Sequence, residues 1–437
     1  MNARSFDDCR VSRRDLLKLA SLGVLAPPIS GWFPGLAAHA AQAKAEGKRP
    51  KACILLWMAG GPSQVHTFNI PTEGEHQEYK GMATAVPGIR ISEYLPKLAG
   101  QMKDLALLQT MSTGVNVHEM GQYLMHIGFR QGTQTYPTLG SIVAKELGNP
   151  DLGIPNYVCI GGGLVPPRSV KPGPLGPNCG PLMVGGKGGV DNLISDSPGH
   201  DGVRAALLDR VEKNAIERFQ SDAVIAHQAS YRKAFELMHS DKNKVFDLKS
   251  EPAKYTDLYG AGEFGQQCLL ARRLVEIGVP FVEVCWGGLG TIAWDSHGGG
   301  AEPVKQKSPA LDAGFSALIT DLKERGLLDS TLIVWMGEFG RGPRPGLGGG
   351  VSAKIGGGHY ATCWTTVLAG AGLKTGQIVG KSTRDAVSVV DRPISAPDFL
   401  ATICKALGIP PHKKYDMGGG RLMPYTAFDS EVVKELF

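Results

Sequence analysis

Residues 52–62 read ACILLWMAGGP, a continuous apolar run that ends in two glycines and a proline. Such a run, bounded by turn residues, is typical of a strand buried on both faces of a parallel sheet. Similar runs occupy residues 105–108, 157–160, 281–286, 331–336 and 365–369. Helical patterns separate them at residues 118–128, 138–148, 201–241, 262–277, 308–326 and 396–407. The alternation predicts an α/β fold with a mainly parallel sheet and helices on both faces.

The chain has 437 residues, of which 42% are hydrophobic, so it can bury a sizeable core and is not disordered throughout. No clear linker divides residues 50–437, and we expect residues 51–437 to form a single elaborated α/β domain. Residues 164–200 are rich in Gly and Pro and lack periodicity. A loop of that length is more often functional or mobile than structural.

The N-terminus has the features of an export signal. Arg13 and Arg14 form a twin-arginine pattern, a mildly apolar stretch follows, and residues 38–40 read AHA, a small-residue cleavage site. Residues 1–40 are therefore predicted to be a cleaved signal peptide and residues 41–50 a linker. No later run of 18 apolar residues occurs, so we expect a periplasmic or secreted protein without a stable membrane anchor after cleavage.

The net charge and the cysteine content exclude several classes of protein. The formal net charge of +5 gives no basis for nucleic-acid binding. Cys9 lies in the signal, and the seven cysteines beyond it form no C-x-x-C pair, which argues against a zinc knuckle, an iron–sulfur site or haem attachment. Cys53, Cys159, Cys285 and Cys363 lie in apolar strand-like runs and are interpreted as small buried hydrophobes. One disulfide is possible, but a disulfide framework is not.

Polar residues follow the predicted strands where parallel sheets bind ligands, beyond the carboxyl ends. They are His66, Thr67, Asn69, Asp295, His297, Glu338, Arg341 and Arg344, and His359 stands just ahead of the sixth predicted strand. Imidazole and carboxylate groups supplied by separate strand ends can enclose a divalent metal; zinc accepts both kinds of ligand, whereas Mn²⁺ or Mg²⁺ favours carboxylates. Taken singly, each has a structural interpretation: Asp295 caps a loop, and Glu338 pairs with Arg341.

Two further histidines flank a predicted helix. His118 and His126 lie eight residues apart, close to two helical turns, and so face the same way. Core or capping roles suit both better than metal ligation, although His118 at the helix start could reach a pocket. Dinucleotide-binding, P-loop and nucleophile-elbow motifs are missing from the sequence.

Several segments together resemble a known family. They are residues 55–64 (LLWMAGGPSQ), 86–96 (VPGIRISEYLP), 118–126 (HEMGQYLMH), 294–298 (WDSHG), 335–344 (WMGEFGRGPR) and 397–403 (PDFLATI). The chain resembles the exported "domain of unknown function 1501" proteins, which are similar to sulfatases of the alkaline phosphatase superfamily. The resemblance implies an alkaline phosphatase/sulfatase-like fold. It also implies metal-assisted hydrolysis or transfer of sulfate or phosphate esters by a Ser, Thr or formylglycine nucleophile.

The resemblance also places individual residues. Asp295, His297 and His359 match positions where the superfamily has metal ligands, and Glu338 stands where a sulfatase strand normally ends in a metal-binding Asp. Other anionic ligands are missing: Ala59 follows the first strand, and the usual Asp-Thr-Phe-Asp run reads His66 to Asn69. No formylglycine element is found. Replacement of a carboxylate by His66 would favour zinc.

Two hypotheses follow. In the first, an exported hydrolase acts on a sulfated or phosphorylated small molecule or glycan. Its metal ligands are Asp295, His297, Glu338, His359 and His66; its nucleophile is Thr67 or Ser63; Arg341 or Arg344 binds the anion; and His118 and Asn69 line the pocket. In the second, the scaffold is degenerate, holds no metal, and captures a sulfated glycan or an envelope partner without catalysis.

Overall fold

A computed structural model describes residues 52–73, 80–161, 171–185, 198–219, 228, 231–232, 235–286, 294–297, 301–344, 346–349 and 357–437. All of these belong to one compact unit, Arg49–Phe437. The predicted signal peptide (1–40), with Arg13 and Arg14, and the predicted linker (41–50) lie outside the described residues.

An eight-stranded sheet forms the centre of this unit, with the order β12-β4-β11-β8-β1-β7-β5-β6. Its strands are β1 (Ala52–Met58), β4 (Leu105–Met111), β5 (Tyr157–Ile160), β6 (Leu182–Val184), β7 (Phe281–Trp286), β8 (Thr331–Met336), β11 (Trp364–Gly370) and β12 (Gln377–Val379). β11 runs antiparallel to β4 and β8, and the other pairings are parallel. The predicted α/β class and all six predicted strands are confirmed.

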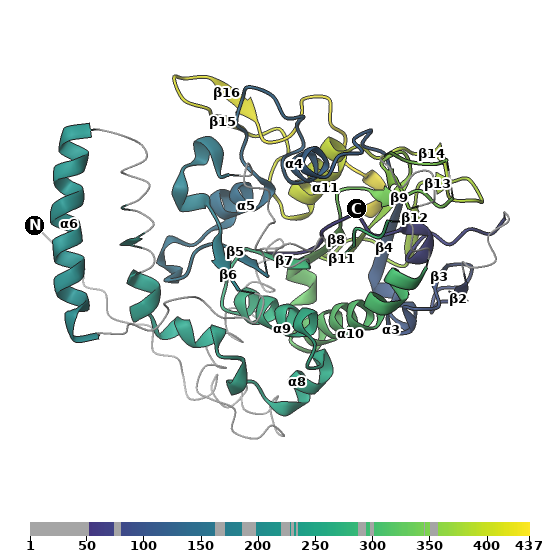
Figure 1. Cartoon of the computed structure of the whole chain (residues 1–437), viewed down its shortest axis with the longest axis horizontal. Helices are drawn as coiled ribbons and strands as arrows, with labels where there is room; N and C mark the ends of the chain where they lie inside the picture. The colour runs from purple at the N-terminus through teal and green to yellow at the C-terminus, as the bar shows by residue number, and fades with distance from the viewer. Residues whose placement is uncertain are drawn as a thin grey trace, which may run out of the picture. The chain divides into compact units, whose positions relative to one another are not determined.

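β1 lies near the middle of the sheet and is buried on both faces. Ile54, Leu56 and Met58 belong to one hydrophobic cluster, and Cys53, Leu55 and Trp57 to the other. This division follows from the strand period of two. Helices α9 (Glu263–Glu276) and α10 (Glu302–Glu324) cover the first face, and α4 (His118–Ile127), α5 (Leu139–Leu147) and α11 (Ala396–Ala406) the second (Figure 1).

The observed helices agree with the predicted ones, with two differences. α10 begins at Glu302 rather than at residue 308, because Pro303 occupies the first turn, where its missing N–H is not needed. The helix predicted over 201–241 is described only in part: α6 spans Asp201–Phe219, and residues 228, 231–232 and 235–239 are also helical. The last of these stretches ends two residues before the predicted end, because Ser240 caps a separate 3-10 helix, Asp241–Phe246. Two further helices are α3 (Pro96–Gly100) and α8 (Ala253–Tyr259).

Short strands account for most of what sequence patterns missed. The stretch predicted as a loop over 164–200 contributes β6 at the sheet edge, where Val184 is buried; three residues are too few to show a strand period. Small antiparallel pairs join β2 (Gly81–Ala83) to β3 (Arg90–Ser92), β13 (Lys381–Ser382) to β14 (Val389–Asp391), and β15 (Lys414–Asp416) to β16 (Leu422–Pro424). The pair of β9 (Gly340–Arg341) and β10 (His359–Tyr360) sets Arg341 opposite His359.

The seven cysteines beyond Cys9 are all buried and none forms a disulfide. Burial raises the pKa of the Cys53, Cys268 and Cys404 thiols, which therefore stay protonated. The burial of Cys53, Cys159, Cys285 and Cys363 agrees with their interpretation from sequence as small apolar side chains.

Candidate metal centre

The candidate site is assembled from the carboxyl ends of parallel strands and the start of one helix. Glu338 follows β8, and the turn at Gly60 and Gly61 follows β1. The short segment 294–297 comes after β7 and is tied to the first strand by a hydrogen bond from the Trp294 N–H to the Ala59 carbonyl, 2.9 Å. His118 begins α4, and His359 begins β10. The sheet edge expected from sequence is thus the edge at which these residues meet.

Four side chains form a compact group of metal-binding type: His118, Asp295, His297 and His359. One ligand atom from each lies within 4.8 Å of all the others. Asp295 Oδ1 is the common neighbour, at 2.7 Å from His297 Nε2, 3.4 Å from His118 Nε2 and 3.8 Å from His359 Nε2. Three imidazoles and one carboxylate are a ligand set that suits zinc.

Hydrogen bonds fix how two of the imidazoles present their nitrogens. His359 Nδ1 faces the Asn116 carbonyl at 2.7 Å, so Nδ1 carries the proton. His118 Nδ1 donates in the same way to Glu338 Oε1, also at 2.7 Å. The Nε2 atoms of both rings are buried and make no hydrogen bond within the described part of the chain. Buried polar atoms that have no hydrogen-bond partner indicate a place for a ligand. A divalent metal fits the group of four side chains.

Glu338 supports the group of four from behind. Its carboxylate is fully buried and accepts two bonds from the Gly60 N–H, at 2.9 and 3.1 Å, besides the bond from His118. Gln122 Nε2 adds a longer donor at 3.4 Å. The position predicted to supply a ligand therefore holds a carboxylate that orients His118, as carboxylates behind metal-binding histidines commonly do.

The Arg341 side chain also forms its hydrogen bonds with groups of the protein. Its guanidinium donates to the carbonyls of Gly60, Gly61 and Gly357 and to Asp295 Oδ1, the last at 2.5 Å. Its side chain is almost fully buried. Rather than facing open space for an anion, it holds Asp295 in place. Arg344, the other predicted anion-binding residue, is exposed.

The electrostatics of the group follow from its packing. Burial opposes the charge of Asp295, but its neighbours His118, His359 and Arg341 outweigh burial and hold the pKa of this carboxyl far below its ordinary value. Burial likewise opposes charge on His118, yet the Asp295 and Glu338 carboxylates raise its pKa to about 9. Burial lowers the pKa of His297. Without a metal, His118 carries a proton that a metal would displace.

The aromatic and glycine residues around the group keep it dense. The Phe339 ring stacks on His359 at 4.6 Å between centroids and lies 5.0 Å from His118. Gly61 has φ of +78°, and a Cβ there would stand 2.7 Å from the Phe339 carbonyl oxygen and 2.8 Å from its ring. Glycine at position 61 is therefore required by both the backbone conformation and the close approach.

The residues expected from the first strand end lie in the 3-10 turn that follows it. Ser63 Oγ and His66 Nδ1 share a hydrogen bond of 2.8 Å, and both side chains are buried. The Thr67 hydroxyl is buried and donates to the Ser63 carbonyl, 2.8 Å. Asn69 bonds Ser382 Oγ at 3.1 Å. His66 and Asn69 do not belong to the group of four, which instead contains His118.

The sequence patterns did not reveal how much the helix that carries His118 contributes to the site. Its second histidine, His126, forms a buried pair with Glu283 at 2.9 Å, which was not foreseen. The available signal was the spacing itself, because histidines eight residues apart lie on the same face of a helix, and this face packs against the sheet.

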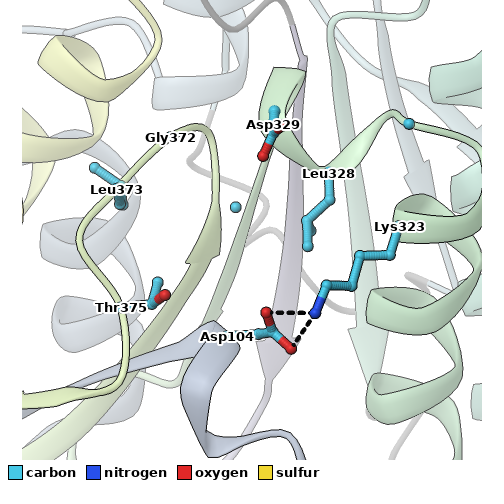
Figure 2. Close-up of a pocket in the computed structure, with 9 residues that line it drawn as sticks. Asp104, Lys323, Leu328, Asp329, Gly372, Leu373 and Thr375 are labelled. Atoms are coloured by element: carbon cyan, nitrogen blue, oxygen red, sulfur yellow. Dashed lines mark hydrogen bonds and ion pairs between the residues drawn. The ribbon is translucent and has the colours of Figure 1, made fainter.

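A separate small pocket lies at the opposite edge of the sheet, with a volume of about 230 Å³ (Figure 2). Its lining includes Asp104, just before β4, and Leu328 and Asp329, just before β8. Asp104 and Lys323 pair there at 2.7 Å through both carboxylate oxygens. The two charges satisfy each other, and the lining holds no histidine or cysteine.

Comparison with known proteins identifies the family. The family model described as "Protein of unknown function (DUF1501)" matches residues 50–437. No curated protein matches the chain. No described helix is both long and apolar enough to cross a membrane.

Several solved structures are similar at low identity. A sulfatase from Pseudoalteromonas sp. aligns over 87% of this chain and 72% of its own, with 13% identity and a TM-score of 0.40. The lipoteichoic acid synthase LtaP from Listeria monocytogenes aligns over 86% and 74%, with 10% identity and a TM-score of 0.37. Alkaline phosphatase from the Antarctic bacterium TAB5 aligns over 83% and 98%, with 14% identity and a TM-score of 0.39. Likeness at this level says nothing about activity.

Proposed function

The chain belongs to the DUF1501 family, and we propose that it is a metal-dependent hydrolase of sulfate or phosphate esters. One observation carries the proposal: the ligand atoms of His118, Asp295, His297 and His359 lie within 4.8 Å of one another. Two of the imidazoles keep buried Nε2 atoms without a hydrogen bond in the described part of the chain. The family's similarity to sulfatases of the alkaline phosphatase superfamily, which the sequence motifs imply, suggests the class of substrate.

The ligand set favours zinc over Mn²⁺ or Mg²⁺. Zinc is borderline-soft and accepts imidazole nitrogens together with a carboxylate oxygen, whereas Mg²⁺ is bound mainly by carboxylates and water. Three of the four candidate ligands here are imidazoles. Glu338, proposed from sequence as a ligand, is assigned the role of orienting His118 instead.

When bound, the metal would act as a Lewis acid on an ester oxygen. The chain supplies the rest. Arg341 holds Asp295 in position, and Arg344, which is exposed, is the candidate for binding the anionic group. Ser63 is the candidate nucleophile, because His66 is hydrogen-bonded to its hydroxyl and can accept its proton. Thr67 bonds the Ser63 carbonyl and stabilises this turn.

The proposal includes the place of action and the substrate source. The twin-arginine pattern at Arg13 and Arg14 would direct a folded, metal-loaded chain to the periplasm or outside the cell. A sulfated or phosphorylated glycan or small molecule is the expected substrate there.

Metal content and activity test the proposal together. The full chain, purified from the compartment to which it is exported, should contain close to one equivalent of zinc or another divalent metal by mass spectrometry. It should also hydrolyse 4-nitrophenyl sulfate or phosphate. His359→Ala should lose both properties, while Asp329→Asn, at the opposite sheet edge, should keep both. Less than about a tenth of an equivalent of any divalent metal would contradict the mechanism, which requires a filled site.

One contact favours a second function. Arg341 Nη2 lies 2.5 Å from Asp295 Oδ1, the same oxygen that faces the histidines, and so competes with a metal for it. A degenerate scaffold that binds sulfated polysaccharide without catalysis is the alternative. Binding that saturates and survives both Asp295→Ala and His297→Ala would support this alternative, and loss of binding in both variants would oppose it.

A further inference from the structure

A second histidine–glutamate pair lies two turns along α4 from the first. His126 Nε2 donates to Glu283 Oε1 at 2.9 Å, and Glu283 comes from the middle of β7. His118 pairs with Glu338 in the same manner. The candidate metal group uses only the first of these pairs.

The second pair is fully buried and completely hydrogen-bonded. Glu283 also accepts from the Tyr157 hydroxyl at 2.5 Å and from the Cys285 thiol at 3.4 Å. His126 Nδ1 donates to the Gln122 carbonyl at 2.8 Å, so both ring nitrogens act as donors and the ring is an imidazolium. The Trp57 ring packs against it, 4.3 Å between centroids. Buried ion pairs of this kind add little net stability and better serve to fix one arrangement.

Gln122 connects the two pairs. Its carbonyl accepts from His126, and its side-chain amide points to Glu338 Oε1, the oxygen that His118 also bonds. Residues 118, 122 and 126 are spaced by about one helical turn, so one face of α4 meets both carboxylates. Gly121 adds a tight contact, because a Cβ there would lie 3.2 Å from Glu338 Cβ.

The start of α4 cannot fix His118 by itself. Val117 occupies the N-cap and provides no side-chain hydrogen bond to the first turn. The first residue of such a helix frays unless packing farther along holds the helix in place. The anchor in α4 is the buried pair at its other end.

We propose that His126 and Glu283 are positioning residues for the metal centre. They set the rotation and axial position of α4, which hold the His118 ring against Glu338 with Nε2 directed at Asp295. Gln122 transmits this constraint. The inference rests on the proposed metal site but not on catalysis by it.

The double variant His126→Gln/Glu283→Gln tests the proposal, because a neutral pair avoids the unpaired buried charge of either single variant. The full chain is loaded with Co²⁺, whose visible absorption reports ligand number and geometry. We expect the Co²⁺ bands to shift and the Zn²⁺ affinity to fall about 10- to 100-fold, as when groups behind a ligand are lost. Asp312→Asn is the matched control. It removes a buried carboxylate that bonds the Lys97 and Leu98 N–H groups on the other face of the sheet.

Several outcomes would decide the matter. An unchanged Co²⁺ spectrum and a Zn²⁺ affinity within threefold of wild type would overturn the proposal. So would an equal change in Asp312→Asn, since the effect would then be general destabilisation. If the double variant does not fold, Gln122→Met removes only the transmitting amide, and the same spectral shift is expected.

A metal-independent measurement separates this inference from the proposed function. Proton NMR of the metal-free chain, with the His118 ring signals assigned by comparison with His118→Ala, should show a slowly exchanging Nδ1 proton in wild type, because Nδ1 donates to Glu338. In the double variant we expect this proton to exchange faster. If wild type binds no metal, the proposed function fails, yet faster exchange in the double variant still supports the positioning role. An exchange rate that is unchanged contradicts it.

Discussion

At the scale of single residues, the candidate centre depends on which ring nitrogens of its histidines donate hydrogen bonds to the protein. His118 and His359 each use Nδ1 as a donor inside the protein, which leaves Nε2 for a ligand. Glu338 makes this arrangement possible for His118, because a fully buried carboxylate can accept from both the ring and the Gly60 N–H.

Glu338→Gln should therefore weaken metal binding. An amide offers one acceptor oxygen where the carboxylate offers two. Its NH₂ group is a donor, so it cannot form a hydrogen bond with the donor that it replaces a carboxylate oxygen for, either the His118 ring or the Gly60 N–H. We expect the Zn²⁺ affinity, measured by isothermal titration calorimetry on the full chain, to fall about 10- to 100-fold. Asp329→Asn should leave it unchanged. An affinity within threefold of wild type would show that Glu338 does not support the site.

The buried pair predicts a pH dependence of stability. The Glu283 carboxylate overcomes burial and raises the pKa of His126 above its ordinary 6.5, so its contribution is complete below that value and lost as pH rises through the raised pKa. His126 and the Tyr157 and Cys285 donors overcome burial and lower the pKa of Glu283 below its ordinary 4.5, so its contribution is lost as pH falls.

The free energy of unfolding of wild type, relative to His126→Gln/Glu283→Gln, should therefore be greatest between pH 4.5 and 6.5 and smaller on either side. Urea unfolding across this range measures the difference. A difference that is constant with pH would mean that the pair carries no charge.

At the scale of elements, the turn after β1 brings a strand end close to its neighbour. Gly61 has a left-handed backbone and stands against Phe339. Gly88 also has a positive φ, +85°, but a Cβ there would meet nothing within 4 Å. An alanine at position 88 would therefore suffer backbone strain alone, whereas an alanine at position 61 would suffer both backbone strain and steric overlap.

Gly61→Ala is expected to destabilise more than Gly88→Ala. The left-handed conformation alone costs about 1–2 kcal/mol for alanine, and overlap with Phe339 raises the cost at position 61 to about 2–4 kcal/mol. Guanidinium unfolding of both variants measures the two costs. Equal losses would show that the turn after β1 can move away from Phe339.

Elements also show the reach and the limit of sequence patterns. The run over residues 52–58 predicted β1 because seven consecutive buried residues leave no polar face. β9 and β10 have two residues each, too few for any period, yet their pairing sets Arg341 opposite His359. α10 began earlier than predicted because Pro303 starts a helix without apolar periodicity.

At the scale of the whole molecule, the site joins segments that are far apart in the chain. His118 and Glu338 are separated by 220 residues and Gly60 and Glu338 by 278. A ligand that bridges such segments stabilises the fold in which they meet.

Metal binding should accordingly raise the melting temperature of the full chain. With free Zn²⁺ at 100 times its dissociation constant, the gain is about 2.7 kcal/mol if the unfolded chain does not bind, and a rise of a few degrees is expected. Differential scanning calorimetry with Zn²⁺ and with chelator measures it. His359→Ala should show no rise. A rise of equal size in that variant would place the metal elsewhere.

The sequence alone determined six of the eight strands of the central sheet, their order with the helices along the chain, and the edge at which polar residues gather. These depend on local periodicity and on glycine and proline at strand ends, which a chain carries before it folds. It also pointed to Asp295, His297 and His359.

Only the tertiary structure decided the roles. His118 belongs to the candidate metal group, Glu338 lies behind it and bonds His118, and Arg341 bonds Asp295. These outcomes depend on distances between side chains from α4, β8, β9 and the segment after β7. Such distances are set by how helices pack on the sheet, and no spacing within a single segment encodes them.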